Sequence, residues 1–453
     1  MPTVREEARD VRVAYECDIC VVGGSCTGVF AAVAAARLGA KVALIEQNGF
    51  FGGVATASLV NIWHSLYNTT GDRQIIAGLT SEVVERMCKR RAAVIGGSDN
   101  PSKYITLNTE VLKIELDDLV TEAGVRPFLH AWFAAPVVEG GRITAAIIED
   151  KSGRRAIRAS FFIDASGDAD VACRAGFECY RHLAIQPPTT CAIIRGLKAA
   201  GKRHPDFAVG KAVFDSMYPN ALKKGFLWSA ESPFGIDETM VAGTRVPEID
   251  ASDADQLTRA EIEGRRQVRD MCDILRDHFL DENLHPLVAL PAKIGVRDSR
   301  HVKCRYGLSE QEVLNGVRFD DAIANGSYRV DVHYNDRPGI IFRYLDGQEV
   351  HVFEDGRKEV RRWRDESGVS PTFYQVPYRC LVPQNSKNLL VAGRALDADR
   401  GAYGAVRVMV NCNQMGQAAG VAACAALQSN VDVADVNVAQ LRKALAQQGA
   451  IVI

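Results

Sequence analysis

The sequence predicts an α/β fold built on a parallel sheet, and three observations within residues 18–56 predict it. An apolar run at 19–22 leads into a glycine-rich turn, and an alanine-rich segment follows that turn. A second apolar run ends in Glu46, which lies 18 positions after Gly28. This order is typical of strand, turn, helix, strand and acid, with the acid close to the ~20 residues at which it binds ribose hydroxyls. The stretch therefore predicts a bound dinucleotide.

The glycine turn explains how a dinucleotide would be held. Gly23 permits the tight turn, Gly28 lets the helix approach the strand, and the helix expected at 27–38 presents free N–H groups to a pyrophosphate. Ser25 stands where the pattern G-x-G-x-x-G has its middle glycine, but a serine still allows close approach and can donate its hydroxyl to a phosphate. The alternative is a glycine turn without a ligand. It is disfavoured because strand, helix, second strand and acid all agree.

Length and composition limit the function classes. A chain of 453 residues exceeds the about 250–300 that one hydrophobic core supports, so two domains are expected. The formal net charge is −2 and no basic face stands out, which argues against a nucleic-acid partner. The first residues have no signal-peptide pattern, and no apolar run reaches the ~20 residues needed to span a bilayer. We therefore expect no membrane partner and a cytoplasmic location.

Cysteine usage does not indicate a metal site. The chain has 12 cysteines, including the C-x-x-C pair Cys17 and Cys20. Both lie in or beside the first predicted strand, where positions i and i+3 point to opposite faces. The others show no spacing typical of iron–sulfur ligands. We therefore expect no metal.

Two later segments share the strand-turn character of residues 15–60. One is 159–174, where an apolar run leads into DASGDADVA, and the other is 388–427, where NLLVAGRAL precedes a long helix of small residues. Elements far apart in sequence can lie side by side in a parallel sheet. Helices are expected at 81–91 and 109–123, and a β-meander at 126–160 with turns at 139–141 and 151–153.

The long block between the second and third segments predicts an inserted domain. It mixes strands at 189–194, 329–333 and 339–344 with a charged helix at 254–280. The expected division is an N-terminal arm at 1–14, a discontinuous nucleotide-binding domain at 15–180 plus 377–453, and an inserted α+β substrate domain at 181–376.

The residues after Glu46 distinguish between dinucleotides. A second glycine pair, Gly52 and Gly53, follows and is itself followed by Thr56, whereas a nicotinamide site needs no such pair. This run resembles the FAD-binding Rossmann domain of the glutathione-reductase-type flavoproteins, in which E-x-x-x-x-x-G-G-x-x-T leads the chain past the flavin. The DASGD turn resembles their A-T-G turn, with Ser166 in the threonine position.

The C-terminal segment extends the resemblance over nearly the whole chain. Residues 390–394 and 404–423 resemble the flavin-contacting strand and helix of those proteins, and their details resemble the broad group of FAD-dependent oxidoreductases. That group also has stretches like RDSRHV at 297–302 and VPYR at 376–379. The resemblance implies a Rossmann-like FAD-binding domain with a three-layer arrangement around a parallel sheet, a β-meander and an inserted α+β substrate domain.

The resemblance also implies which residues hold FAD. A helix N-terminus near Asn411 or Gln414 would stabilise the negative charge of a reduced flavin; the alternative is that this small-residue helix only packs closely. The residues expected to bind the cofactor are Gly23, Gly24, Ser25, Cys26, Thr27, Gly28, Glu46, Gln47, Gly52, Gly53, Thr56, Pro136, Ala165, Ser166, Gly167, Gly393, Arg394, Arg407, Met415 and Gly416. No second glycine fingerprint is present, which favours electron exchange with a substrate or a protein partner.

The candidate catalytic residues come mainly from the inserted block. Arg297 and Arg300 could hold a carboxylate and His301 could move a proton, although an ion network with Asp298 is the structural alternative. Arg379 is expected near the domain cleft. Two further residues are His64, which could lie near the flavin ring, and His333, which is the weaker candidate.

Two cysteines need separate mention. Cys412 is the best candidate for a reactive or flavin-linked thiol, although an inert buried thiol is the simpler interpretation. Cys26 lies in the phosphate turn and is given no redox role.

The predicted function is hydride transfer between a small organic substrate, which can bear a carboxylate, and N5 of FAD. One alternative is a flavoprotein of RNA modification, which the near-neutral charge disfavours. Another is a non-enzymatic FAD-binding redox sensor. An electron donor or acceptor partner and an oligomer remain open at this point.

Overall fold

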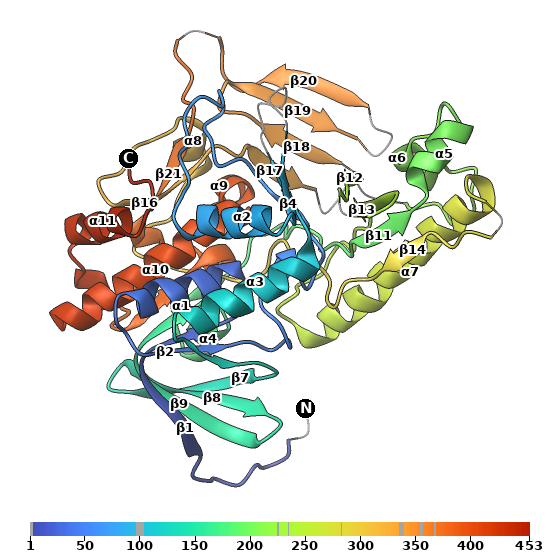
Figure 1. Cartoon of the computed structure of the whole chain (residues 1–453). Helices are drawn as coiled ribbons and strands as arrows, with labels where there is room; N and C mark the ends of the chain where they lie inside the picture. The colour runs from blue at the N-terminus through green and yellow to red at the C-terminus, as the bar shows by residue number, and fades with distance from the viewer. Residues whose placement is uncertain are drawn as a thin grey trace.

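The computed structural model describes residues 3–96, 104–223, 226–233, 235–281, 283–334, 339–353, 357–366 and 368–453. A seven-stranded sheet forms one end of the molecule, in the order β6-β2-β1-β9-β8-β7, with β22 also paired to β9 (Figure 1). The strands are β1 (Arg12–Val22), β2 (Val42–Ile45), β6 (Arg126–Phe128), β7 (Trp132–Glu139), β8 (Arg142–Asp150), β9 (Gly153–Asp164) and β22 (Leu389–Val391).

The three separated segments meet in this sheet as parallel neighbours. Strand β1 pairs with β2 on one side and β9 on the other, and β22 continues beyond β9 with Leu390 opposite Ile163. Strands β7, β8 and β9 form the expected antiparallel meander. The predicted α/β class is confirmed.

The parallel strands lie between two other layers. The helices α1 (Cys26–Arg37), α3 (Thr109–Glu122) and α10 (Met409–Ser429) cover one face, where Ile19, Val21 and Leu390 are buried. The meander and α4 (Asp170–Arg174) cover the other face, where Cys20 and Phe162 are buried. Alternating side chains of each strand thus enter two different cores.

Helices α1 and α10 pack with almost no space between their main chains. A Cβ atom added at Gly416 would overlap the carbonyl oxygen of Thr27, and one at Gly420 would overlap that of Ala31. Glycine is therefore required at both positions for steric reasons. The small-residue helix owes these glycines to close helix packing, which is the structural alternative considered for it.

The predicted helices are present with shifted ends. Helix α2 (Leu79–Lys89) begins before residue 81 because Gly78 is its N-cap, and the side chain of Asn108 caps α3 by accepting from two main-chain N–H groups. The charged helix is α7 (Ala254–His278). The C-terminal segment contains α9 (Arg400–Val406) and α10, separated by a break at Arg407 and Val408, and ends with α11 (Val438–Gln447).

The block 181–376 contributes to more than one core. Strands β11 (Ala192–Arg195), β12 (Trp228–Glu231), β13 (Glu238–Ala242) and β14 (Leu287–Ala289) form one sheet, which shares a core with α7 and the short helices α5 (Leu197–Arg203) and α6 (Val209–Phe214). In contrast, β16 (Ala322–Gly326) pairs with β21 (Tyr374–Pro377) and packs on α10 in the main core.

A further antiparallel sheet lies at the top of the molecule in Figure 1, to the right of α9. Its strands are β17 (Val330–His333), β18 (Ile340–Arg343), β19 (Gln348–Val352) and β20 (Lys358–Arg362). The remaining elements are β3 (Ile62–Trp63), β4 (Ala93–Ile95), β5 (Ile105–Leu107), β10 (Cys179–Tyr180), β15 (His301–Val302) and α8 (Glu310–Leu314). No helix in the described ranges is both long enough and apolar enough to cross a bilayer.

Candidate active site

A cavity of about 1090 Å³ opens at the carboxyl ends of the parallel strands and extends to the β17–β20 sheet. The nucleotide end of the cavity is the part lined by Gly23, Ser25, Glu46, Gly53 and Gly167, and the inner end is the part lined by His64, Arg297, Tyr328, Asp331 and Arg407. Pockets for single small ligands occupy about 300–1,000 Å³. The cavity can therefore hold a dinucleotide together with a substrate.

At the nucleotide end, glycines let main-chain segments touch. Gly23 has φ +103°, and a Cβ atom there would overlap the carbonyl oxygen of Ala165; one at Gly28 would overlap that of Gly23. A Cβ atom at Gly53 would lie 2.6 Å from Cβ of Ser25. The second glycine pair therefore lets its loop pack directly on the first glycine turn. The two segments together form a narrow wall of main-chain groups.

Ser25 directs its hydroxyl to the cavity side of this turn. It is the N-cap residue of α1 in an extended conformation, yet its side chain caps none of the helix N–H groups. It lines the cavity together with Thr27. The hydroxyl and the first-turn N–H groups of α1 are thus available to an anionic ligand.

Glu46 is fixed by three donors. Its carboxylate accepts from the main-chain N–H of Gly24 at 2.6 Å, from that of Asn48 at 2.8 Å and from the Asn48 side-chain amide at 2.6 Å. Burial raises the pKa of Glu46, while these hydrogen bonds act in the opposite direction. The carboxylate still lines the cavity, so its free lone pairs can accept from ribose hydroxyls.

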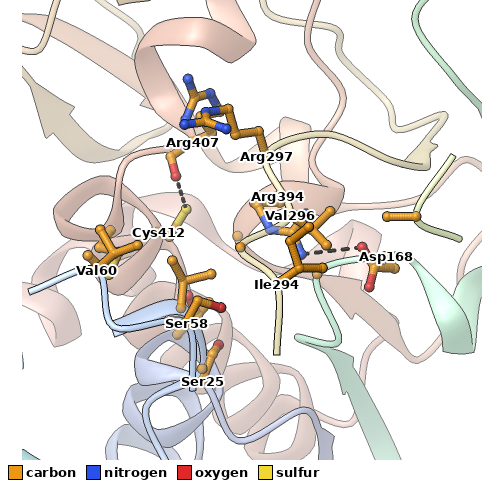
Figure 2. Close-up of a pocket in the computed structure, with 18 of the residues that line it drawn as sticks. Ser25, Ser58, Val60, Asp168, Ile294, Val296, Arg297, Arg394, Arg407 and Cys412 are labelled. Carbon is orange, nitrogen blue, oxygen red and sulfur yellow. Dashed lines mark hydrogen bonds and ion pairs between the residues drawn. The ribbon is translucent and has the colours of Figure 1, made fainter. Parts of the chain in front are cut away.

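Hydrogen bonds to the side chain of Asp164 hold the DASGD turn in place. The side chain of Asp164 accepts from Ser166 and from the first turn of α4, and Gly167 has φ +83°. A Cβ atom at Gly167 would lie 2.5 Å from Nη2 of Arg394. The glycine thus leaves room for this guanidinium, which pairs with Asp168 at 3.3 Å (Figure 2).

Several polar atoms at the cavity wall lack a partner. Nη1 of Arg394, Nε of Arg407 and both amide atoms of Asn413 are buried without a hydrogen bond to any described residue. Because buried polar atoms are normally paired, these atoms are suited to a polar ligand. They lie beside the N-terminal turn of α10, where Val408, Met409, Cys412 and Asn413 line the cavity. Guanidiniums, an amide and a helix N-terminus fit the pyrophosphate and the polar edge of FAD.

The inner end has an excess of positive charge. Figure 2 shows the side chains of Arg297 and Arg407 close together on one side of the cavity. Burial and the charge of Arg407 lower the pKa of Arg297 to about 10. Asp331 pairs with Arg407 at 3.2 Å and accepts from the hydroxyl of Tyr328 at 2.7 Å. One carboxylate thus faces two guanidiniums, which favours an anionic ligand.

Two neutral histidines line the same end. Burial, followed by the charge of Arg329, lowers the pKa of His64 to about 3, and its ring stacks on Tyr328 with centroids 4.1 Å apart. Burial and the nearby arginines place the pKa of His333 well below its usual value. Nδ1 of His333 lies 3.4 Å from Nε of Arg245, which can only donate. His333 is therefore a neutral ring with its proton on Nε2.

The stretch RDSRH divides between the cavity and its support. Arg297 lines the cavity and donates to the carbonyl of Pro187 at 2.8 Å. Arg300 instead donates to the carbonyl of Asp168 and pairs with Asp170 at 2.5 Å, so it holds the loop after the DASGD turn from behind. The ion-network alternative describes Arg300, and no contact of Arg300 with the cavity supports its predicted role as a substrate ligand.

His301 belongs to a second buried cluster. Its Nε2 lies 2.9 Å from Asp298, whose other oxygen lies 3.3 Å from His182. Although burial opposes it, the hydrogen bonds from both histidines lower the pKa of Asp298 well below its usual value. His301 is fully buried and does not line the cavity. The predicted proton transfer by His301 therefore has no direct path to a ligand.

Several other predicted residues lie outside the cavity wall. Arg379 is 46% exposed, pairs with Asp321 at 2.9 Å and packs on Tyr306, because the chain re-enters the main core away from the nucleotide. Gly24, Gly28 and Thr56 shape the turns without lining the cavity, Pro136 lies in β7, and Met415 and Gly416 face the helix packing. The residues that do line it are Gly23, Ser25, Cys26, Thr27, Glu46, Gln47, Gly52, Gly53, His64, Ala165, Ser166, Gly167, Arg297, Gly393, Arg394 and Arg407.

The two cysteines that were considered for the site, Cys26 and Cys412, are inert thiols in this arrangement. All 12 lie in the described part of the chain and are free thiols. Burial raises the pKa of Cys412 to about 12 and that of Cys26 to about 12, although both line the cavity. Neither is a thiolate near neutral pH, which agrees with the inert interpretation of Cys412.

Sequence reasoning missed part of the inner end. Tyr328, Arg329, Asp331 and Asn413 line the cavity, as does the loop at 292–297. The signal for the first three was present, because YRVD at 328–331 runs into the short strand β17 and places charged residues where that strand starts. Their meeting with Arg407 depends on tertiary structure, so the sequence contains no local sign of it.

A comparison with protein-family models identifies the family of the chain. A family model described as FAD dependent oxidoreductase matches residues 18–445, and no curated protein matches the chain. Among solved structures, the chain is similar to a geranylgeranyl bacteriochlorophyll reductase-like protein from Thermoplasma acidophilum, at 12% identity over 96% of this chain and 84% of that chain with a TM-score of 0.49. It is also similar to a myxobacterial chondrochloren halogenase, at 12% identity over 96% and 80% with a TM-score of 0.46. A third is p-nitrophenol 4-monooxygenase from Pseudomonas putida, at 11% identity over 96% and 84% with a TM-score of 0.43.

Proposed function

The chain belongs to the FAD-dependent oxidoreductase family, and on that premise we propose that it transfers a hydride between a small organic acid and N5 of FAD. The predicted family, cofactor and enzyme class are confirmed by the family match. Bound FAD supplies the hydride acceptor or donor. The residues at the nucleotide end would hold its pyrophosphate and ribose, with Glu46 on the ribose and the first turn of α1 on the phosphates.

The observation that supports an acidic substrate is the charge of the inner end. Arg297 and Arg407 both line the inner end, where Asp331 pairs with Arg407 and acts on Arg297 only through its charge. Nε of Arg407 is buried and has no hydrogen-bond partner among the described residues. A carboxylate bound by both guanidiniums would neutralise this excess and fix the substrate in one orientation.

His64 and His333 are proposed to handle the proton that accompanies the hydride. Nε2 of His333 carries the ring proton, because Nδ1 faces the Arg245 donor, and it lies 3.6 Å from a carboxylate oxygen of Asp331. A substrate oxygen would share this donor with Asp331. His64 is held neutral by burial and by the surrounding cations. An anion bound among those cations would raise the pKa of His64 towards its usual value, so substrate binding itself would make His64 a better base.

The test uses the purified holoprotein. It is photoreduced without oxygen and mixed with a panel of 2-oxo acids and unsaturated acids, and the oxidised holoprotein is mixed with the corresponding reduced acids. We expect the visible absorbance of the flavin to change rapidly with at least one acid and not with its neutral amide. A flavin that exchanges electrons equally with acid and amide would contradict the acidic substrate, and a flavin that reacts with neither would favour the redox-sensor alternative.

The RNA-modification alternative predicts a different result. A protein that binds RNA loses affinity steeply as salt increases, because phosphates are neutralised by basic side chains. The formal net charge of −2 gives this alternative no support. Salt-sensitive binding of transfer RNA by the holoprotein would revive it.

A further inference from the structure

Arg329 has an unusual setting in the wall of the cavity. Its guanidinium carbon lies 4.1 Å from the ring centroid of Phe342, 5.2 Å from that of Tyr328 and 5.5 Å from that of Tyr344. The residue immediately precedes β17 and lines the cavity. The three rings therefore hold one guanidinium in place beside the space available to a substrate.

No acidic side chain in the described ranges pairs with Arg329. Its Nε is buried without a hydrogen-bond partner among those residues. Asp331 acts on it only through space, because both oxygens of that carboxylate are engaged by Arg407 and Tyr328. Ring faces offset only part of the desolvation of a buried cation, so among the described residues Arg329 has no directly paired counter-charge.

Arg343 on the neighbouring strand provides the contrast. It is the last residue of β18 in the same sheet, but it pairs with Glu349 at 2.6 Å and with Glu310 at 2.7 Å. Glu349 on β19 and Glu310 on α8 thus pair with the arginine outside the cavity, whereas no acid in the described ranges pairs with the arginine that lines it. This difference indicates that the anion for Arg329 comes from a ligand.

The surface beside Arg329 is apolar. Ile340 pairs with Val352 and Phe342 with Val350 across β18 and β19, and all four side chains line the cavity. Together they form a small hydrophobic cluster that belongs to neither of the cores around the large sheet. A ligand with an apolar body could bury its surface on these four residues, which we call the apolar wall.

We propose that Arg329 and the apolar wall form a second subsite, which receives the apolar body and a second anionic group of the substrate. The substrate class is then an apolar-bodied acid with two acidic groups. This inference rests on the proposed function, in which Arg297 and Arg407 bind the first group.

The test measures ligand binding to the oxidised holoprotein by calorimetry and by perturbation of the flavin spectrum. The probes are benzoate, the diacids isophthalate and terephthalate, and the monoamide of each diacid. Each monoamide has the shape of its diacid but lacks the second charge. We expect at least one diacid to bind about tenfold more tightly than its monoamide, as a charged hydrogen bond allows.

The variants assign that preference to one residue. In Arg329→Met the diacid and its monoamide should bind equally, whereas Arg329→Lys should retain part of the preference because it retains the charge. Arg318→Met is the matched control: Arg318 also lies over a ring, 3.5 Å from the centroid of Phe373, but it does not line the cavity. The control should keep the full preference, and flavin content reports whether each variant is folded.

Two results would overturn the proposal. One is that no diacid binds more tightly than its monoamide in the wild-type protein. The other is a preference that survives Arg329→Met in folded holoprotein. Failure of the proposed function is distinguishable, because binding of benzoate itself would then be unaffected by Arg297→Met.

Discussion

The two ends of the cavity are built from different parts of the chain. The nucleotide end consists largely of main chain, in which Gly23, Gly28 and Gly53 leave no room for an added carbon. The inner end consists of side chains that converge from distant elements, with Arg297 and Arg407 close together and Asp331 paired to Arg407. Ligand binding at the nucleotide end should therefore depend on the shape of the main chain, and ligand binding at the inner end on the charge of the side chains. Variants at one end should leave the property of the other end intact.

Valine at Gly28 should have the largest effect, which is loss of the holoprotein. Its side chain would overlap the carbonyl oxygen of Gly23 in a turn that cannot move without displacing α1. We expect Gly28→Val to retain no flavin, measured as the ratio of flavin to protein absorbance. Gly201→Ala is the control, because no atom lies within 4 Å of the carbon that it adds. Normal flavin content in Gly28→Val would contradict the steric account of the turn.

Arg297→Met should weaken recognition of the acid substrate at the inner end and leave FAD binding at the nucleotide end unchanged. Loss of one charged hydrogen-bond donor should lower kcat/KM for an acid substrate by about 10–100-fold, with flavin content unchanged. Arg379→Met is the control, since Arg379 is 46% exposed and remote from the cavity. If the neutral amide of the substrate lost as much as the acid, Arg297 would not be recognising charge.

Glutamine at Glu46 should weaken FAD binding by about tenfold. The amide retains one acceptor oxygen but loses the charge that faces the N–H groups of Gly24 and Asn48. The dissociation constant can be measured by fluorescence quenching as FAD is added to flavin-free protein. Glu82→Gln, which alters a surface ion pair with Arg37, should leave it unchanged. If Glu46→Gln bound FAD as tightly as the wild-type protein, Glu46 would not be the residue that binds the ribose of FAD.

Replacing His182 should have the smallest effect, on the stability of the fold. Against the effect of burial, the hydrogen bond to Asp298 raises the pKa of His182 above 6.5. Its stabilising contribution is complete below that value and is lost as the pH rises through the raised pKa. The contribution of Asp298 behaves oppositely: it is complete above 3.8 and is lost as the pH falls through the lowered pKa.

We therefore expect His182→Gln to lower the unfolding midpoint by up to about 3 °C at roughly pH 6, and by less at roughly pH 9. Differential scanning calorimetry of the holoprotein at both values measures this. His204→Gln, a change at an exposed histidine, provides the baseline. If the loss of unfolding midpoint in His182→Gln grew as the pH rose, the cluster would not be stabilised by a protonated His182.

The nucleotide end could be predicted because its residues are contiguous. The segment from Gly23 to Gly53 contains the turn, the helix, the acid and the second glycine pair, so local sequence defines their geometry. Confirmation of the α/β class follows from the same regularity. The inserted domain was less predictable, since β16 and β21 pack on α10 rather than with α7.

The inner end was only partly predictable. The stretch RDSRH identified Arg297, but its neighbours Arg300 and His301 point to the loop at Asp168 and to Asp298. Side chains only a few positions apart in an irregular segment face different surroundings, and the sequence alone does not reveal which. Arg407 lies beside Arg297 because the chain is not helical between the end of α9 and the start of α10. The continuous apolar pattern of the sequence contains no sign of this break.

The contact between α1 and α10 has a mechanical consequence. The main chain of α10 touches that of α1 at Gly416 and Gly420. The two helices are therefore packed as one rigid unit, with little freedom to slide past each other. The starts of both helices lie at the cavity wall, one at the nucleotide end and the other beside Arg407. The close packing therefore fixes the distance between these two helix starts, whereas the sheet of β11 to β14 packs with α7 in a separate core.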